Sequence, residues 1–422
     1  MGRDKIKLAD EVKKFLKQSF SPKFGKLQKT FRKDPLWQKL LDVGTELWLD
    51  TGNIEEAQQH WTAEFSALTT NNTLLNKEVQ SGKYDSLIKD ADKLLTKYEL
   101  NDTERLLEIA FILNAWHGLR LVEKFDCYVS VEEHTALAHY VGPAVYYAKR
   151  YYEICPERFI VKIPFTPAGL ITTRKLWEED VPVNHTLGFS ARQNYLIARI
   201  GRPAYVNVFL GRLNSFVKEN QLGDGEYVGE KATLASQRIL RQLKEIDPTQ
   251  SKQIGASFRG GEQVRDLAGI DVMTMPPAVA GQFKDLKLPP DSIYNMSGLD
   301  YRAGVKPDVD QQEIRLDTLW NIPCELIDCC DAFEKKCFDD MTAEELVKFF
   351  GEHKCADILV PWTDEQMRFS SKEGKIPKLE NWKQLLKDKT IGLDSLMNLA
   401  GLMSFTQDQM AMDAKVKEVL RK

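Results

Sequence analysis

Lys162 lies in the middle of an apolar run, RFIVKIPFTPAGL, at residues 158–170. Burying an unpaired ammonium group is so unfavourable that such a lysine extends to water, pairs with a carboxylate, or loses its proton. In a strand, Lys162 shares one face with Ile160 and Pro164. If the opposite face meets helices, Lys162 points into the protein. Burial there favours the neutral amine, the nucleophile that attacks a carbonyl carbon to form a Schiff base.

Other polar residues recur where short apolar runs end. They are Asp50, Asn71, Glu132, Asn184, Thr186, Asn207, Arg212, Ser257 and Arg259. The carboxyl ends of parallel strands meet at one face of a barrel, so these side chains are expected to converge on one basin. Two arginines with a serine suit a phosphate group, and a neutral lysine facing it suggests a phosphorylated sugar ketone or aldehyde.

Each of these residues also has a purely structural interpretation. Asp50 and Asn71 could cap the helices that follow them. Glu132 and Lys162 could form a buried ion pair that only fixes packing. Arg212 and Arg259 could be surface salt-bridge partners of little energetic weight. The joint occurrence of all these residues favours the chemical interpretation.

The elements that must position these residues alternate between strands and helices. Eight strands are predicted, at Thr45–Asp50, Ser66–Thr70, Cys127–Glu132, Phe159–Ile163, Val181–Leu187, Ala204–Phe209, Ile254–Phe258 and Asp271–Thr274. Helices such as Asp102–Leu121 and Ala232–Glu245 lie between them. Eight such units predict an α/β fold, a (β/α)₈ barrel.

The barrel is expected to occupy residues 44–310, between an N-terminal helical extension at 1–43 and a helical insertion at 311–404. Five prolines in 276–310 indicate a boundary or long loop there. Thr342 and Glu345 form a capping-box pattern at the start of a helix in the insertion. Residues 405–422 are expected to form a final helix that packs on the barrel.

Composition excludes several classes of function. The net charge of −4 and pI near 6.0 argue against a nucleic-acid-binding protein, because no basic excess is available for phosphates. The first twenty residues lack a signal-peptide apolar stretch, and no apolar run is long enough to span a membrane, so a cytoplasmic protein is expected.

Residues 1–40 hold 12 Lys and Arg against 4 Asp and Glu, with Ile6, Val12, Phe15 and Leu16 on one helical face. A helix docked on the main domain is favoured over a membrane or partner arm.

The seven cysteines include no CxxC pair, which fits reduced thiols in the cytosol. Five of them, Cys324, Cys329, Cys330, Cys337 and Cys355, fall close together. Buried thiols are favoured there over a redox pair or metal site, since His353 is the only histidine nearby.

Seven ordered motifs resemble those of the transaldolase family. They are LWLDTGN, ALTTNNTLL, YVSVEEH, IVKIPFTPAGL, NHTLGFS, VNVFLGR and GASFR, within residues 44–280, and the tail DQMAMDAKVKEVLRK resembles the family's final helix. The resemblance implies a Schiff-base (β/α)₈ enzyme that needs no metal or cofactor. It acts on small sugar phosphates, and whether it forms a homodimer is left open.

The resemblance also implies a role for each residue. Lys162 forms the Schiff base with sedoheptulose 7-phosphate or fructose 6-phosphate. Asp50 takes the C4 hydroxyl proton, and Glu132 moves protons through a water that Thr186 positions. Asn71 and Asn184 bind donor hydroxyls and position the lysine. The phosphate is bound by Arg212, Ser257 and Arg259, with Asn207 and Phe209 also facing the substrate.

Some positions depart from the family's pattern. Asn72 replaces a proline after Asn71, Asn207 replaces a serine, Val208 replaces a proline, and His134 replaces an acidic residue. An unusually long stretch of sequence also separates the predicted eighth strand from the last helix. A fructose 6-phosphate type aldolase is one alternative, although Phe209 and Glu132 favour transfer. A non-catalytic barrel that serves as a scaffold or regulatory protein is another.

Overall fold

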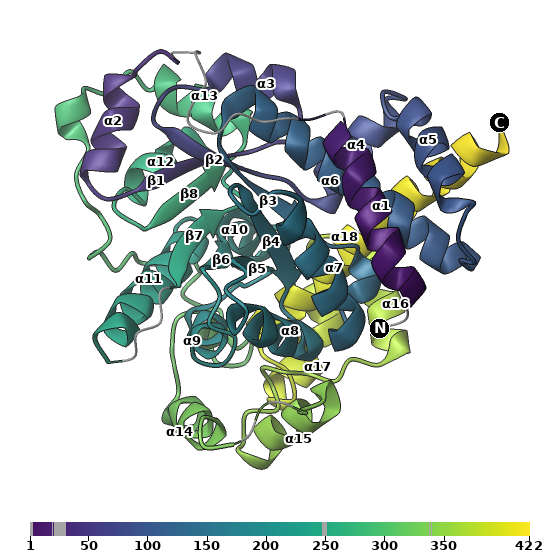
Figure 1. Ribbon diagram of the computed structural model, residues 1–422. Coiled ribbons are helices and arrows are strands. Elements are labelled where there is room, and N and C mark those ends of the chain that lie inside the picture. Colours follow the sequence, from purple (N-terminus) through teal and green to yellow (C-terminus); the bar gives the residue numbers. More distant parts are fainter. Residues whose placement is uncertain (1–2, 19, 21–30, 247–250, 337, 339) are drawn as a thin grey trace.

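Eight parallel strands close into a barrel in the order of the sequence (Figure 1). The structure is a computed structural model, which describes residues 3–18, 20, 31–246, 251–336, 338 and 340–422. The strands are β1 (Glu46–Asp50), β2 (Phe65–Thr69), β3 (Tyr128–Glu132), β4 (Phe159–Pro164), β5 (Val183–Thr186), β6 (Tyr205–Phe209), β7 (Lys252–Ala256) and β8 (Val272–Met275). The predicted (β/α)₈ barrel is therefore confirmed.

Helices surround this barrel and extend beyond it. Those up to the eighth strand are α1 (Arg3–Gln18), α2 (Pro35–Asp42), α3 (Ile54–His60), α4 (Asn72–Gln80), α5 (Asp85–Leu95), α6 (Asp102–Phe125), α7 (Val141–Ile154), α8 (Pro167–Trp177), α9 (Ala191–Ile200), α10 (Leu210–Glu219), α11 (Val228–Ile246) and α12 (Gly261–Asp266). The later ones are α13 (Pro277–Asp285), α14 (Cys324–Phe333), α15 (Ala343–Glu352), α16 (Asp364–Glu373), α17 (Leu379–Lys387) and α18 (Leu393–Arg421). Short 3₁₀ turns occupy Thr135–Leu137 (η1), Pro290–Ser292 (η2) and Leu316–Leu319 (η3).

Three strands end earlier than predicted, and β2 does so by one residue, at Thr69. β5 stops at Thr186 and β7 stops at Ala256, because the next residues, Leu187 and Ser257, have φ values of 66° and 68°. A positive φ takes the chain out of the extended region and ends strand pairing. Ser257 therefore lies in the loop after β7 rather than in the strand.

The interior of the barrel is divided into an apolar end and a polar end. Trp48 of β1 and Tyr205 of β6 pack across the barrel with ring centroids 4.8 Å apart. Asp50 lies two residues beyond Trp48 on the same strand, and therefore on the same face, nearer the carboxyl ends of the strands. On the outer face of β4, the ring of Phe159 packs so closely on Gly118 of α6 that a Cβ there would lie 2.9 Å from it. Alternation along β4 then directs Lys162 inward, as predicted.

Helix α1 docks on α6 and α7, which confirms the favoured interpretation of the N-terminal segment (Figure 1). Leu8, Val12 and Leu16 are buried along its inner face. The prediction that Ile6 shares this face was wrong, because Ile6 is 52% exposed and Leu8 takes the inner position. In the part of the chain that the structure describes, no helix combines the length and apolar character needed to cross a membrane.

The C-terminal segment packs on the barrel. Helix α13 begins at Pro277, in a stretch predicted as a boundary or loop, because proline fits the first turn of a helix. The capping box at Thr342 and Glu345 is confirmed at the start of α15. Helices α14 and α15 pack against α9 and α8 at one end of the molecule (Figure 1). The last helix begins at Leu393, so the predicted boundary between residues 404 and 405 lies inside it.

A buried charge network connects this segment to the barrel. Arg192, at the start of α9, donates to both carboxylate oxygens of Asp394 at 2.8 and 2.6 Å, and to Asp357 at 2.7 Å. Arg315 also donates to Asp357, at 2.9 Å. The two guanidinium groups oppose the effect of burial and hold the pKa of Asp357 below its usual value. Every charge in this network has a partner, which is what makes its burial tolerable.

The clustered cysteines contribute to a core shared by α8, α9, α14 and α15. Cys329, Cys330 and Cys355 are buried in it, while Cys324 is exposed. Cys337 lies outside the described residues. The predicted buried thiols are confirmed for three of the five cysteines, and no metal-binding group of three or more His, Cys, Asp or Glu residues occurs within the described ranges.

Glu133 is expected to make the stability of the protein depend on pH. Its side chain is 3% exposed and burial raises its pKa well above the usual value, so the folded state holds a proton that the unfolded chain releases. The contribution of Glu133 to stability is therefore most favourable below about pH 4.3 and is lost as the pH rises towards its folded-state pKa. We expect Glu133→Gln to raise the free energy of unfolding at pH 7 by on the order of 1–3 kcal/mol, and by little at pH 4.5. Urea unfolding of both proteins at the two pH values tests this, and an equal difference at both would contradict it.

Candidate active site

Most of the predicted site residues line a single cavity of about 240 Å³ at the carboxyl ends of the strands. Those lining it are Asp50, Asn71, Lys162, Asn207, Phe209, Arg212, Ser257 and Arg259. The remaining three, Glu132, Asn184 and Thr186, are buried on the neighbouring strands β3 and β5. All the residues selected from the sequence are thus gathered at one end of the barrel, where parallel strands direct their functional groups.

Lys162 is 4% exposed and lies beside a carboxylate. Its Nζ is 3.9 Å from Oε1 of Glu132, which is the register partner of Lys162 on β3, and it donates to the carbonyl of Thr70 at 3.2 Å. The main-chain N–H of Asn72 donates to the other oxygen of Glu132 at 2.9 Å. The ion pair proposed as a structural alternative is therefore present. It also places a proton acceptor beside the amine, which general acid–base chemistry requires.

Both carboxyl groups near Lys162 hold protons more tightly than usual. Burial raises the pKa of Glu132, although Lys162 and the Asn72 N–H oppose it. Burial likewise raises the pKa of Asp50, against the charge of Lys162 and a 2.8 Å hydrogen bond from the Thr69 hydroxyl. Asp50 does not cap the next helix, since Asn53 does so by accepting from the N–H of Glu56. Two carboxyls with raised pKa values beside an amine are suited to donating and accepting protons.

Three amide side chains and a hydroxyl of the predicted site come from β5, β6 and the start of α4. Asn71 caps α4 by accepting from the N–H of Leu74 at 2.9 Å, so it has the structural role considered for it while also lining the cavity. Asn207 donates to Oδ1 of Asn184 at 2.6 Å, and Asn184 is the register partner of Lys162 on β5. The hydroxyl of Thr186 is buried and makes no hydrogen bond to any described residue.

The two arginines and Ser257 form one wall of the cavity. Arg212 is 5% exposed, and its Nη1 is buried without a hydrogen-bond partner among the described residues. Burial and the nearby charge of Arg259 lower the pKa of Arg212 to about 10. Ser257 is brought close by Gly211, where a Cβ would lie 2.1 Å from the Ser257 carbonyl oxygen. Within the described structure neither arginine forms a salt bridge, so the surface-pair interpretation was wrong. A buried, unpartnered guanidinium group indicates a binding site for an anion.

Several residues that line the site were not predicted from the sequence, and two of them come from the C-terminal segment. Lys375, in the loop between α16 and α17, and Phe405 of α18 both line the cavity. The ring centroid of Phe405 lies 5.8 Å from Nζ of Lys162 and 5.5 Å from Cζ of Arg212. Neither residue follows a barrel strand, so the strand-end pattern gave no signal for them. Lys77 of α4 also lines the cavity, on the same helix face as Thr73.

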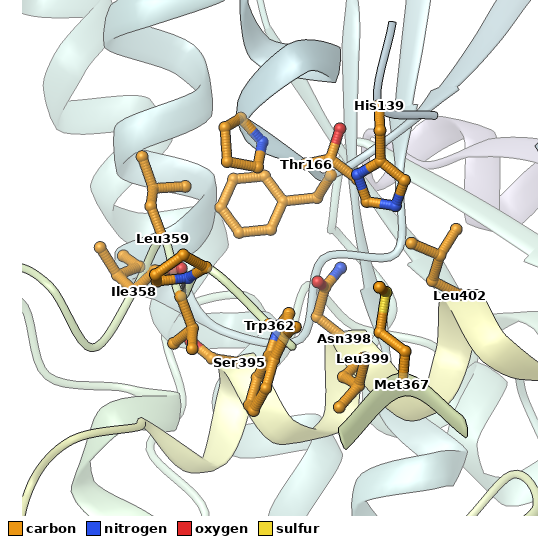
Figure 2. A pocket seen from close by; sticks show the side chains of 14 residues that line it. His139, Thr166, Ile358, Leu359, Trp362, Met367, Ser395, Asn398, Leu399 and Leu402 are labelled. Carbon is orange, nitrogen blue, oxygen red and sulfur yellow. Dashed lines mark hydrogen bonds between the residues drawn. The ribbon is translucent and has the colours of Figure 1, made fainter. Parts of the chain in front are cut away.

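Figure 2 shows a different cavity, of about 180 Å³, between Thr166 at the start of α8 and Asn398 of α18. Its lining is mostly apolar and includes Leu359, Trp362 and Met367. It contains none of the predicted site residues. The cavity lined by Lys162, Asp50, Arg212 and Arg259 is therefore the candidate active site.

Comparison with known proteins agrees with this geometry. Residues 47–320 match the family model described as Transaldolase/Fructose-6-phosphate aldolase. The chain is 34% identical over 269 residues to a probable transaldolase of Thermus thermophilus, covering 62% of this chain and 100% of that protein. It is 29% identical over 240 residues to a probable transaldolase of Dictyostelium discoideum, covering 53% of this chain and 74% of that protein. A transaldolase of Shewanella baltica is 26% identical over 246 residues, or 57% and 76% of the two chains. The chain therefore belongs to the transaldolase/fructose-6-phosphate aldolase family of enzymes.

Proposed function

We propose that this protein is a transaldolase that moves a three-carbon dihydroxyacetone unit between sugar phosphates through a Schiff base on Lys162. The donor is sedoheptulose 7-phosphate or fructose 6-phosphate, and the acceptor is glyceraldehyde 3-phosphate or erythrose 4-phosphate. These are reactions of the pentose phosphate pathway. The observation that carries the proposal is the position of Lys162, buried beside Glu132 in the cavity that Asp50 and Arg212 also line. Nη1 of Arg212 has no hydrogen-bond partner among the described residues.

The reaction begins when the amine of Lys162 attacks the ketone carbon of the donor and water is lost. Asp50 then removes the C4 hydroxyl proton, the C3–C4 bond breaks, and an aldose phosphate leaves. The three carbons that stay on Lys162 form an enamine, which attacks the aldehyde carbon of the acceptor. Hydrolysis of the resulting Schiff base releases the new ketose and restores the amine.

Neighbouring groups support these steps. Glu132 transfers protons through a water held by Thr186, whose buried hydroxyl makes no hydrogen bond to a described residue. Asn71 and Asn184 bind donor hydroxyls and orient Lys162, and the hydrogen bond from Asn207 holds Asn184 in place. Phe209 borders the substrate. Arg212, Ser257 and Arg259 bind the phosphate group, which supplies the anion that Arg212 lacks.

A fructose 6-phosphate aldolase would use the same lysine but release free dihydroxyacetone. A coupled assay with fructose 6-phosphate, with and without erythrose 4-phosphate, separates the two activities. We expect cleavage to depend on the acceptor, and an equal rate without it would contradict transfer. A scaffold protein is disfavoured because burying two carboxyls and an unpartnered arginine destabilises a fold that makes no use of them.

Asn72 offers a direct test of the role of Glu132. Its N–H is one of the groups that favour the carboxylate form, and proline, the residue of the resembling family at this position, has no N–H. Residue 72 is the first of α4, where proline is well tolerated. We expect Asn72→Pro to raise the pKa of Glu132, to move the acidic limb of the kcat profile to higher pH, and to lower kcat at neutral pH about two- to tenfold.

The matched control is Asn72→Ala, which keeps the N–H and removes only the side chain. Its acidic limb should coincide with that of the unchanged protein. Identical limbs for the proline and alanine variants would contradict a proton-transfer role for Glu132. The cytosolic location, the homodimer and the absence of a metal requirement stay predictions.

A further inference from the structure

A lysine from outside the matched family region borders the site. Lys375 lies beyond residues 47–320 yet lines the same cavity as Arg212, Ser257 and Arg259. We propose that Lys375 is a further phosphate-binding residue, which the C-terminal segment adds to the active site. Lys375 would then set the preference for phosphorylated substrates. This inference rests on the proposed function.

The loop that carries Lys375 is fixed against the helix that carries Arg212. Asn220, which ends α10, donates to the carbonyl of Pro377 at 3.1 Å and accepts from the N–H of Leu379 at 2.7 Å. Gly374, with φ of 90°, makes the turn out of α16. The α17 end of the short loop is thus tied to α10, and Lys375 lines the same cavity as Arg212.

The other end of the loop is anchored through Glu373. Its carboxylate accepts from Nδ2 of Asn381 and from the indole N–H of Trp382, both at 2.7 Å. Helix α16 in turn packs along α18, where Gln407 donates to the hydroxyl of Ser371 at 3.0 Å. These contacts connect the loop to the helix that supplies Phe405 to the site.

The charge around Lys375 is that of an anion site. Lys77, Arg212 and Arg259 border the same cavity, and within the described ranges none of the four cations forms a salt bridge. Burial has the largest effect on the pKa of Lys375 and lowers it. The charge of Arg212 lowers this pKa further, while the charge of Asp408 opposes the shift. Like charges repel unless an anion lies among them. A phosphate monoester carries about −1.5 to −2 charge at neutral pH, so it would offset part of this positive charge.

Lys375→Met tests the inference, with Lys378→Met as the matched control. Lys378 is exposed and belongs to the same loop, as Lys375 does, but it does not line the cavity. We expect Lys375→Met to raise the KM for fructose 6-phosphate and erythrose 4-phosphate roughly fivefold to twentyfold, with kcat within about twofold. The KM for unphosphorylated glyceraldehyde as acceptor should stay within about twofold, since it has no phosphate to bind. The control should change none of these values.

Calorimetric titration with inorganic phosphate separates this inference from the proposed function. We expect Lys375→Met to weaken phosphate binding by the same factor as the KM change. Weakened phosphate binding without any transferase activity in the unchanged protein would overturn the proposed function and support the role of Lys375. Equal KM values and phosphate affinities for the Lys375 and Lys378 variants would overturn the inference, as would a wild-type protein that binds no phosphate.

Discussion

Replacing Lys162 with methionine is expected to lower kcat for three-carbon transfer by at least about a thousandfold while the protein stays folded. The other groups around the site can bind and polarise a sugar phosphate. Lys77 and Lys375 also line the cavity, but among the described residues only Lys162 is paired with Glu132. Methionine has a similar length without the charge, so it fills the same space in the barrel. Steady-state kinetics and circular dichroism of the two proteins measure the two effects.

The structural alternative for Lys162 makes the opposite prediction. If the 3.9 Å pair with Glu132 only fixed packing, the methionine variant would lose stability and keep much of its kcat. Burial already raises the pKa of Glu132. The charge of Lys162 is the strongest interaction that opposes this shift, and the substitution removes it. Without Lys162 the pKa of Glu132 rises further and its carboxyl holds a proton more tightly, which limits the cost of losing the partner, so we expect little loss of stability. A variant that keeps more than about a tenth of the activity would contradict the Schiff-base role.

Replacing Arg212 with methionine is expected to reduce binding of phosphorylated substrates while stabilising the fold. Two charge-assisted hydrogen bonds to phosphate contribute about 3 kcal/mol, so kcat/KM should fall roughly a hundredfold or more. Arg212 is 5% exposed and its Nη1 has no partner among the described residues, so its removal relieves a buried charge. The free energy of unfolding should rise by about 1 kcal/mol or more.

Arg192 is the matched control, because it is also buried but fully paired. It donates to Asp394 and Asp357, and Arg192→Met leaves those carboxylates without their partner. We expect that variant to lose about 3–5 kcal/mol of stability. Kinetics and urea unfolding of both variants are compared with the unchanged protein. If Arg212→Met destabilised the protein as Arg192→Met does, Arg212 would be structural rather than an anion-binding residue.

The barrel was predictable because its strands are short apolar runs separated by amphipathic helices, and parallel pairing brings their carboxyl ends to one face. That geometry alone made Asp50, Lys162 and Arg212 candidates for one site, and the structure places them in one cavity. The pairing of Glu132 with Lys162 also followed from adjacent strands. These features depend on local pattern and sheet topology.

Other features depend on contacts distant in sequence and could not be predicted. Lys375 and Phe405 reach the cavity because the chain returns across the barrel mouth after its eighth strand. The exposure of Ile6 depends on which face of α1 meets α6 and α7. The end of β7 depends on the positive φ of Ser257, a residue type that rarely adopts it. Asn72 departs from the family's sequence pattern, but the pattern does not show that its N–H donates to Glu132. That hydrogen bond is visible only in the folded chain.

Trapping the covalent intermediate tests the central claim most directly. The protein is incubated with fructose 6-phosphate, reduced with borohydride, digested, and mapped by mass spectrometry. A Schiff base becomes a stable secondary amine, so we expect a substrate-derived mass on Lys162 and none in the Lys162→Met variant. No adduct, or an adduct that persists in the variant, would contradict catalysis by Lys162.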